Sequence, residues 1–359
     1  MTILIHTIPD DLHAAAVKVA LKSKGIEAIT WYTGDFPSQQ ELTVKLSGSE
    51  SPRYSVLGKH HDIKSLDEIS TVWHRRIPRF QRAPDVVDEF DAPFVTDEIS
   101  NFLCTSIPLI GQDAFWVNDY AASQYADNKL VQLKAASRAG IGIPATIATN
   151  SPDELRAFVE EMGERKVIYK PFRGYNWTYA DKRRTTYTKI FTLADLPADA
   201  LLEACPGIYQ EYTEKHVELR VTVMGKLCVT VALHSDDKED WRVSSEMRKL
   251  RASKHKLPQI VEEQCLAIMS RLNLVFGCID LILTPEGEYV FLEVNEMGQF
   301  LWVEYLVPDI NLLENFCHFL ASGDRDFSGS KSRTPILRSE IMKTDAFQLL
   351  AKQSREHVF

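Results

Sequence analysis

Three oxygen-bearing side chains lie near the C-terminal end of the chain, in a stretch where apolar and polar residues alternate. Asp280 falls within the run 277–283, and Glu293 and Asn295 end the run that follows a Pro-Glu-Gly turn. This pattern predicts two strands joined by a tight turn. Residues two apart on a strand point to the same face, so Glu293 and Asn295 share a face and can meet Asp280 on the neighbouring strand.

Carboxylates that are surrounded by apolar side chains are costly unless a cation compensates their charge. Hard oxygen ligands without neighbouring Cys or His side chains are typical of magnesium, which proteins usually bind through one or two carboxylates together with phosphate oxygens. The three residues are therefore candidate magnesium ligands. A hairpin whose acidic side chains only face water remains the alternative.

Two lysines upstream are candidates for binding the phosphates that such a metal ion accompanies. Lys129 follows Asp127 and Asn128 in a predicted helix, and Lys170 ends the apolar run 167–169. Two ammonium groups and a magnesium ion can bind and neutralise a triphosphate. The alternative for each lysine is a solvated surface charge. The sequence contains neither a P-loop pattern nor a dinucleotide-binding glycine pattern.

The segment Gln210, Glu211 and Tyr212 lies where the composition of the chain changes. A chain that crosses between two domains can offer backbone N–H and C=O groups to the edge of an adenine. Glu218 and Arg220 share one face of the next predicted strand. There the carboxylate could bind ribose hydroxyls, and the guanidinium could bind a phosphoryl group. The alternative for this pair is a surface ion pair, which contributes about 0–1 kcal/mol.

The composition limits the classes of partner. The chain has 359 residues and a formal net charge of -9, which argues against general binding to nucleic acid or to membrane surfaces. Its six cysteines lack the paired spacing of a zinc site or a disulfide framework, which is typical of a reducing compartment. No signal peptide or membrane-spanning run is recognised, so a cytoplasmic protein is expected.

The periodicity of apolar residues predicts a mixed α/β (α+β) fold that begins with a strand-helix-strand unit. A helical segment is expected over 84–104 and a single helix over 120–139. Residues 172–184 and 235–256 are typical of polar, charged loops, and a strand is expected over 185–192. The predicted domains are residues 1–118, a central unit 119–206, a C-terminal unit 207–325 and a tail 326–359 with a terminal helix.

The order of these motifs resembles that of the ATP-grasp ligases over roughly residues 120–320. Within that family the chain is most similar to the peptide maturases that make microviridin-type and other graspetide peptides. The segments that carry this similarity are 127–133, 143–146, 149–152 and 298–304. The run Val-Trp-His-Arg-Arg at 72–76 resembles part of the pre-ATP-grasp domain of these maturases. The resemblance therefore implies an ATP-grasp fold with an N-terminal pre-ATP-grasp α/β domain.

The resemblance implies an ATP-dependent carboxylate ligase that uses ATP and Mg²⁺. A substrate carboxylate attacks the γ-phosphate to give an acyl phosphate, and a hydroxyl or amine then displaces phosphate to form an ester or an amide. Arg220 and Arg242 are the candidates for stabilising the charge on the transferred group, although Arg242 could also be an ordinary solvated loop residue. The remaining implied roles are phosphate binding by Lys129 and Lys170, adenine binding by Gln210, Glu211 and Tyr212, ribose binding by Glu218, and magnesium binding by Asp280, Glu293 and Asn295.

The segment after Lys170 departs from many ATP-grasp proteins, in which a glycine-rich phosphate loop follows the second lysine. Here the segment 172–179 contains one glycine, Gly174, among several aromatic residues. Phosphate binding by the backbone is therefore less expected, and closure through aromatic packing is the alternative.

In the peptide maturases, the activated carboxylates belong to Asp or Glu side chains of a precursor peptide with a leader and an acidic core. Basic clusters on this acidic chain are the expected contacts for such a peptide. Solvated surface charge is the alternative for each cluster. The segment 185–188 has the β-propensity to pair with a leader, and the resemblance also implies a homodimer. The candidate peptide-binding residues are Arg75, Arg76, Lys182, Arg183 and Arg184.

Two other functions remain open. A ligase of the same fold could join free amino acids or modify a protein terminus, and a protein of another class could bind a nucleotide or a peptide without catalysis. The joint presence of the two lysines with Asp280, Glu293 and Asn295 argues against a binding-only protein. The leading hypothesis is therefore crosslinking or macrocyclisation of a ribosomally made peptide.

Overall fold

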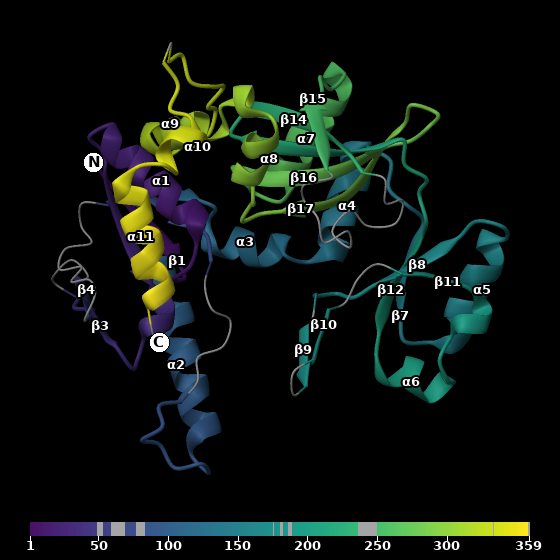
Figure 1. Cartoon of the computed structure of the whole chain (residues 1–359). Helices are drawn as coiled ribbons and strands as arrows, with labels where there is room; N and C mark the ends of the chain where they lie inside the picture. The colour runs from purple at the N-terminus through teal and green to yellow at the C-terminus, as the bar shows by residue number, and fades with distance from the viewer. Residues whose placement is uncertain are drawn as a thin grey trace.

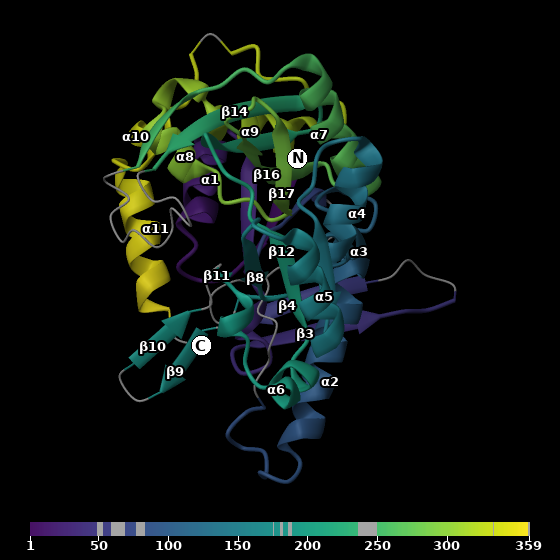
Figure 2. The ribbon, with the colours of Figure 1, turned by 90° about the vertical axis from the view of Figure 1, so that its right-hand side faces the viewer.

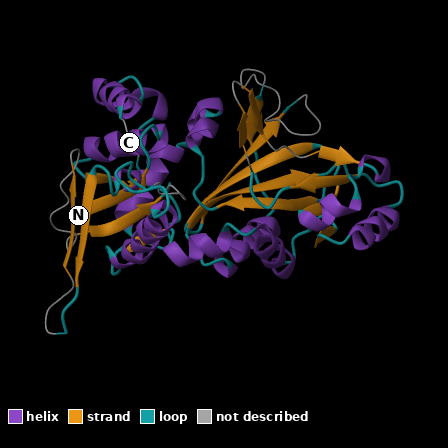
Figure 3. Ribbon diagram, turned by 90° about the horizontal axis from the view of Figure 1, so that it is seen from below, coloured by secondary structure: helices purple, strands orange, loops and turns teal. Residues whose placement is uncertain are grey.

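The computed structural model of the chain describes residues 1–48, 53–58, 69–76, 83–174, 176–179, 182–185, 189–235, 250–332 and 334–357 (Figure 1). Three sheets of four or five strands and two two-stranded hairpins occur in this part of the chain. Figure 3 shows the N-terminal sheet at one end of the molecule and the later sheets toward the other.

Four parallel strands form the N-terminal sheet. The elements of this region are β1 (Thr2–Thr7), α1 (Leu12–Ser23), β2 (Glu27–Tyr32), β3 (Gln40–Lys45), β4 (Arg53–Gly58), β5 (Ile69–His74), α2 (Ala92–Ser106) and β6 (Phe115–Val117). The sheet order is β2-β1-β5-β6, while β3 and β4 form a separate antiparallel hairpin. The expected strand-helix-strand unit is confirmed, because α1 connects the parallel strands β1 and β2.

The helix expected over 84–104 begins later, at Ala92. Proline lacks the backbone N–H that a helix interior needs, so it is tolerated in the first turn and not beyond it. Pro93 is the second residue of α2, so the helix can begin only shortly before it. Residues 84–91 form turns instead.

The central region forms an antiparallel sheet in the order β11-β8-β12-β7. Its elements are α3 (Tyr120–Ala126), α4 (Lys129–Ala139), β7 (Thr146–Thr149), α5 (Pro152–Met162), β8 (Val167–Lys170), β9 (Asn176–Tyr179), β10 (Lys182–Thr185), β11 (Lys189–Phe191), α6 (Asp199–Ala204) and β12 (Gly207–Glu211). Leu155 and Phe158 of α5 and Leu202 of α6 pack with Tyr209 of β12 in one core. The two helices therefore cover one face of this sheet, the face to which Tyr209 points.

The C-terminal region forms a second antiparallel sheet, in the order β15-β14-β13-β16-β17. Its elements are β13 (Val217–Met224), β14 (Leu227–His234), β15 (Arg251–Lys254), α7 (Gln259–Arg271), β16 (Phe276–Leu283), β17 (Tyr289–Asn295), α8 (Leu301–Leu306), α9 (Leu312–Ser322), α10 (Arg338–Ile341) and α11 (Asp345–Glu356). Both α4 and α7 contact this sheet (Figure 2). The hairpin of β16 and β17 confirms the two strands expected over 277–295.

The helix expected over 120–139 is divided into α3 and α4. Asn128 lies between them in an extended conformation, and its Oδ1 accepts hydrogen bonds from the backbone N–H groups of Leu130 (3.1 Å) and Val131 (3.3 Å). An asparagine that caps a helix in this way competes with continuation of the preceding helix. As a result Lys129 is the first residue of α4.

Two segments expected to be loops contain strands. The loop expected over 172–184 includes β9 and β10, which pair with each other. Of the strand expected over 185–192, Thr185 ends β10, residues 186–188 lie outside the described residues, and residues 189–191 form β11. The loop expected over 235–256 ends with β15, which pairs with the edge of β14. These strands are polar, so backbone pairing with a neighbour, and not apolar alternation, determines where they form.

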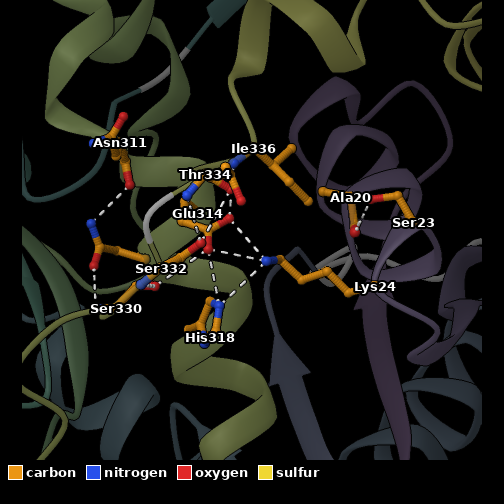
Figure 4. A network of polar contacts seen from close by, with 11 residues as sticks. Ala20, Ser23, Lys24, Asn311, Glu314, His318, Ser330, Ser332, Thr334 and Ile336 are labelled. Atoms are coloured by element: carbon orange, nitrogen blue, oxygen red, sulfur yellow. Dashed lines mark hydrogen bonds and ion pairs between the residues drawn. The ribbon is translucent and has the colours of Figure 1, made fainter.

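The C-terminal tail packs on the N-terminal region, where α11 lies beside α1 (Figure 1). Glu314 of α9 joins the two ends of the chain (Figure 4): its buried carboxylate pairs with Lys24 Nζ at 3.0 Å and accepts from the backbone N–H of Ile336 at 3.0 Å. His318 lies 3.0 Å from the same carboxylate. Among the described residues, every helix is too short or too polar to cross a membrane.

Asn118 joins the N-terminal sheet to the C-terminal sheet. Its side-chain Nδ2 donates to the backbone oxygens of Phe276 (2.8 Å) and Glu296 (2.7 Å). Its Oδ1 accepts from the backbone N–H groups of Val275 and Phe276, both at 2.9 Å. Asn118 is 1% exposed, so one amide satisfies four backbone groups that water cannot reach.

We predict that Asn118→Ala lowers the free energy of unfolding by about 3–5 kcal/mol, because it leaves several buried backbone groups without partners. Urea denaturation of the ligand-free protein measures this change. Asn150→Ala is the matched control, because the exposed Asn150 makes a single bond to the backbone oxygen of Glu203. If Asn118→Ala lowers the free energy of unfolding no more than the control does, Asn118 does not stabilise the contact between the two sheets.

Candidate active site

Arg220, Asp280 and Glu293 lie side by side on three neighbouring strands. The strand register places Asp280 of β16 opposite Arg220 of β13 and opposite Glu293 of β17. Arg220 Nη1 donates to both carboxylate oxygens of Asp280, at 2.8 and 2.9 Å, and Arg220 Nη2 donates to the backbone oxygen of Gln299 at 3.2 Å. Asp280 and Glu293 therefore lie next to each other, as the sequence analysis expected, and Arg220 lies beside Asp280.

A β-bulge determines which way Glu293 points. The register shifts between Asp280 and Leu281, so that Leu281 pairs with Phe291 and Leu292 is the extra residue. Phe291 and Val294 then pack in the same core although they are three residues apart. The residue between them in alternation, Glu293, is left on the opposite face with Asp280.

The charge of Arg220 is stabilised by its neighbours. Burial alone would lower the pKa of Arg220, which is 7% exposed, but the carboxylates of Asp280 and Glu293 outweigh this effect and raise the pKa. The side chains of Asp280 and Glu293 are 28% and 33% exposed. The arginine is thus a permanent cation beneath two carboxylates that a ligand can reach.

Lys129 completes a row of charged side chains with Arg220, Asp280 and Glu293. Its Nζ lies 3.3 Å from Glu293 Oε2, so the first residue of α4 reaches across to β17. The Asn128 cap fixes this position, because it starts the helix at Lys129. The structure therefore brings the first expected phosphate-binding lysine to the expected metal-binding carboxylates.

The third expected metal ligand, Asn295, ends β17 on the same strand as Glu293. Its Oδ1 accepts from the backbone N–H of Gly298 at 2.8 Å, which closes a tight turn after the strand. Gly298 has a φ of +51°, and a Cβ there would lie 2.6 Å from the ring of Phe276. Glycine is therefore required at this turn.

The oxygen donors of this site fit a magnesium ion. Asp280 and Glu293 are adjacent, partly exposed carboxylates, and the amide oxygen of Asn295 retains acceptor capacity beside its bond to Gly298. In the part of the chain that the structure describes, no group of three or more His, Cys, Asp and Glu side chains is placed to bind a metal. An ion here would therefore need further oxygens, such as those of a nucleotide phosphate.

Lys170 and Gln210 share one face of the central sheet. In the register of β12, Gln210 lies opposite Ile168 of β8 and opposite Thr146 of β7, and Ile208 lies opposite Lys170. Paired and alternate residues of antiparallel strands point to the same face. Lys170 and Gln210 therefore point away from α5 and α6.

The backbone of the expected adenine-binding junction is partly occupied. The backbone N–H of Glu211 donates to Ala145 at 2.9 Å, and that of Tyr212 donates to Lys166 at 2.8 Å. The carboxylate of Glu211 pairs with Arg165 Nη1 at 3.1 Å. These two backbone donors, which the sequence analysis offered to an adenine edge, are engaged instead by the backbone oxygens of the residues that precede β7 and β8.

Glu218, the expected ribose ligand, lies two residues from Arg220 on β13 and shares its face. Its carboxylate pairs with Lys215 in the ligand-free chain. Glu218 therefore lies on the expected face of the strand, and its carboxylate is paired with Lys215.

Arg75 does not belong to a basic surface cluster, which corrects the expectation from the sequence. Its side chain is fully buried, and its Nε donates to Asp11 Oδ2 at 2.6 Å. Its Nη1 donates to the backbone oxygens of Met297 (3.0 Å) and Gly298 (2.8 Å). Arg75 thus connects the N-terminal sheet to the turn after Asn295, and it cannot contact a peptide from the surface.

The other residues expected to contact a peptide lie just after β5 and on β10. Arg76 is half-buried, and its backbone N–H donates to the backbone oxygen of His6. Lys182, Arg183 and Arg184 lie on β10, paired with β9. Arg242, the second candidate for stabilising the transferred group, lies outside the described residues.

Two residues of this region were not recognised from the sequence. Thr146 fixes the amide of Gln210, and Asp11 fixes the guanidinium of Arg75. Asp11 carried a signal, because an acidic residue before a helical pattern predicts a cap, but its second role depends on a contact across 64 residues. No pattern in the neighbouring sequence indicates that the hydroxyl of Thr146 contacts Gln210.

Comparison with protein families identifies the class of this fold and site. Residues 126–312, which are over half of the chain, match the RimK-like ATP-grasp domain, and residues 2–124 match the MvdD pre-ATP grasp domain. The chain therefore belongs to the RimK-like ATP-grasp family and is an ATP-dependent ligase. The resemblance and the fold class expected from the sequence are confirmed.

Several solved structures are similar over nearly the whole chain. The macrocyclase MdnC bound with precursor peptide MdnA, from Microcystis aeruginosa MRC, is 25% identical with a TM-score of 0.76, covering 90% of this chain and 100% of its own. The Chryseobacterium gregarium RiPP-associated ATP-grasp ligase, in complex with ADP and a leader and core peptide, is 26% identical with a TM-score of 0.80 and coverage of 90% and 98%. The macrocyclase MdnB from Microcystis aeruginosa MRC is 29% identical with a TM-score of 0.74 and coverage of 89% and 98%. A search of curated proteins finds no match.

We predict that Asp280→Asn destabilises the ligand-free protein by about 1–3 kcal/mol, because it leaves the buried charge of Arg220 without a carboxylate. Glu293→Gln is the matched comparison and costs about 0–1 kcal/mol, because the pair that it breaks with Lys129 is exposed to water. Urea denaturation without nucleotide or metal distinguishes the two. Equal losses would show that Arg220 does not depend on Asp280.

We predict that Asp11 makes stability fall in acid. Burial alone would raise the pKa of Asp11, but the charge of Arg75 and hydrogen bonds from Arg75 and Thr7 lower it from 3.8 to about 2. Because the pKa of Asp11 is lower in the folded protein than in the unfolded chain, the ionised carboxylate stabilises the folded state above its ordinary pKa. This stabilisation, about 2 kcal/mol, is lost as the pH falls toward 2.

Asp11→Asn therefore reduces the steepness of acid unfolding between about pH 5 and pH 2, measured by urea denaturation at successive pH values. Asp10→Asn is the control, because Asp10 is exposed and asparagine tolerates its φ of 62°. If stability falls as steeply in acid in Asp11→Asn as in the wild-type protein, Asp11 does not cause this loss of stability.

Proposed function

We propose that this ligase activates Asp or Glu side chains of a ribosomally made precursor peptide as acyl phosphates. The activated carboxyl is then joined to a hydroxyl or amine side chain to form an ester or amide crosslink, with ADP and phosphate as products. The observation that carries the proposal is the row Lys129, Glu293, Asp280 and Arg220, which presents two cations and two carboxylates on one face of the C-terminal sheet.

The peptide substrate is supported by the relatives. The similar structures of MdnC and of the Chryseobacterium gregarium ligase contain precursor, leader or core peptides, and MdnC and MdnB are macrocyclases. This chain covers 98% or more of each of them. A peptide substrate is therefore favoured over free amino acids, and a homodimer in the cytoplasm is part of the proposal on resemblance alone.

In the proposed complex, the nucleotide lies between the two antiparallel sheets. Lys129 and Lys170 bind phosphate oxygens, and Glu218 releases Lys215 to bind ribose hydroxyls. Asp280, Glu293 and Asn295 provide the oxygens for a magnesium ion, which neutralises phosphate charge when it is bound.

Arg220 stabilises the charge that develops during transfer. A peptide carboxylate oxygen attacks the γ-phosphorus as the bond to ADP breaks, and the hydroxyl or amine then attacks the acyl carbon, loses its proton and displaces phosphate. Because Asp280 and the Gln299 carbonyl fix the guanidinium before reaction, little reorganisation is needed at that moment. Arg242 is proposed as a second such group.

The acidic core of the peptide is attracted by local basic residues, since the chain as a whole has a net charge of -9. Arg76 and the three basic residues of β10 remain the proposed contacts, and Arg75 is withdrawn because it is buried. The segment 185–188 is the proposed place for pairing with a leader strand, and residues 186–188 of it lie outside the described residues.

We predict that Glu293→Ala lowers peptide-dependent ADP release by at least about a hundredfold, because it removes a metal ligand and the partner of Lys129. The assay uses a short acidic peptide encoded beside the gene, and mass spectrometry detects the loss of one water for each bond formed. Glu286→Ala, in the exposed turn of the same hairpin, is the control. Normal turnover in Glu293→Ala would contradict the metal assignment.

Wild-type ADP release that no peptide stimulates would instead contradict the peptide-ligase proposal. Crosslinked product with free amino acids in place of the peptide would favour the other ligase function.

A further inference from the structure

Three large apolar side chains of the N-terminal region are exposed within nine residues of one another. Val86, Phe90 and Phe94 are 92%, 91% and 68% exposed. Large apolar side chains are usually buried, and a group of them at the surface marks a site of interaction. They belong to the segment 84–98, the α2 arm, which comprises the turns before α2 and the first half of that helix.

The α2 arm projects from the rest of the N-terminal region. Figures 1 and 2 show the turns before α2 at the lower tip of the molecule, beyond the end of the N-terminal sheet. Ile99 and Leu103, which follow the arm in α2, are buried. The second half of the helix therefore anchors the arm, while the first half and the turns before it present side chains to solvent.

Hydrogen bonds fix the backbone of the arm. Asp88 Oδ1 accepts from the backbone N–H of Phe90 at 2.9 Å, and the backbone oxygen of Asp88 accepts from the backbone N–H of Ala92 at 3.0 Å. The backbone N–H of Ala83 donates to Thr96 Oγ1 at 3.1 Å, which closes the segment into a loop. A surface that is ordered before binding loses little conformational entropy when a partner docks. The backbone that carries Phe90 therefore has the order that a docking site needs.

The arm is strongly acidic. Residues 83–128 contain no Lys, Arg or His, although the chain has 41 Lys and Arg residues in all. Six acidic side chains of the arm are exposed: Asp85, Asp88, Glu89, Asp91, Asp97 and Glu98. Within the arm, the exposed apolar side chains are therefore accompanied by negative charge alone.

This charge determines which class of partner fits the arm. Acidic side chains repel nucleic acid, anionic membranes and the acidic core of the proposed substrate peptide. A symmetric contact with a second copy of the chain would place the same acidic side chains opposite one another. A partner with an apolar face and with Lys and Arg side chains beside that face complements both features of the arm.

We propose that the α2 arm is the docking site for a basic amphipathic helix of another protein. The apolar face of that helix packs against Val86, Phe90 and Phe94, and its Lys and Arg side chains pair with the acidic residues of the arm. An amphipathic helix carries an apolar stripe with charged residues beside it, so it can make both contacts at once. The arm contains none of the residues proposed to bind nucleotide, metal or substrate peptide, so docking does not depend on the proposed function.

A synthetic peptide tests the proposal, with binding measured by fluorescence anisotropy in the absence of nucleotide and metal. The probe is a labelled helical peptide of about 18 residues, with Leu along one face and Lys along the other. The wild-type protein binds it, and the double substitution Phe90→Ser/Phe94→Ser weakens binding at least about tenfold. Leu201→Ser/Ile260→Ser, at exposed positions on α6 and α7, is the matched control and leaves the affinity unchanged. Urea denaturation checks that both variants are folded.

The role of the acidic side chains is tested in the same assay. Glu89→Gln/Glu98→Gln weakens binding of the peptide at least about threefold at low ionic strength, and added salt weakens binding to the wild-type protein. Glu160→Gln/Glu164→Gln changes the net charge equally at exposed positions elsewhere and is the control. A peptide of the same pattern with Glu in place of Lys does not bind.

The other outcomes overturn the proposal. If the wild-type protein does not bind the Leu/Lys peptide, a basic helix is the wrong partner. If Phe90→Ser/Phe94→Ser binds the peptide as tightly as the wild-type protein does, net charge alone causes the binding and the arm is not a docking site. If the peptide does not bind and the same substitutions convert a dimer into a monomer in sedimentation, the arm binds a second copy of the chain instead.

Discussion

The ion pair between Arg220 and Asp280 is the interaction on which the arrangement of the site depends. A buried guanidinium is costly without a carboxylate, and two adjacent carboxylates repel each other without a cation. The row Arg220, Asp280, Glu293 and Lys129 satisfies both requirements, because its charges sum to zero across three strands and one helix. The charges of this row are therefore balanced before any ligand binds. In the proposed complex, a magnesium ion and Lys170 compensate the negative charge of the nucleotide polyphosphate.

The N-terminal region is part of this site although its strands belong to another sheet. Asn118 binds the backbone oxygen of Glu296, and Arg75 binds those of Met297 and Gly298. The three residues that follow Asn295 are thus fixed from outside their own sheet. A domain that would otherwise be described as an addition to the ligase determines the backbone beside Asn295, one of the proposed metal ligands.

Apolar alternation predicted much of the architecture, including the hairpin of β16 and β17 and the parallel start of the chain. The convergence of Asp280 with Glu293 was also predicted, because period-two alternation is a local property. The bulge at Leu292 could not be predicted with it. Only the finished core shows that Phe291 and Val294 need the same face.

Other features depend on contacts that the sequence does not display. Arg75 has the composition of a surface cluster, but its burial depends on Asp11 and on a turn more than two hundred residues away. The division between α3 and α4 depends on one asparagine side chain that bonds to the backbone ahead of it. Charge and periodicity identify residue types, whereas burial and capping decide their positions, which is why the prediction for Arg75 was wrong.

The packing of α11 on α1 has a consequence for biosynthesis. Ile3 and Val17 belong to the same core as Phe316 and Phe347, so β1 and α1 bury their apolar sides against helices that are made much later. Domains usually fold as units in the order of synthesis, but this core joins elements that are far apart in the sequence. Its completion must therefore wait until α9 and α11 have left the ribosome, and until then β1 and α1 expose apolar surface to which chaperones can bind.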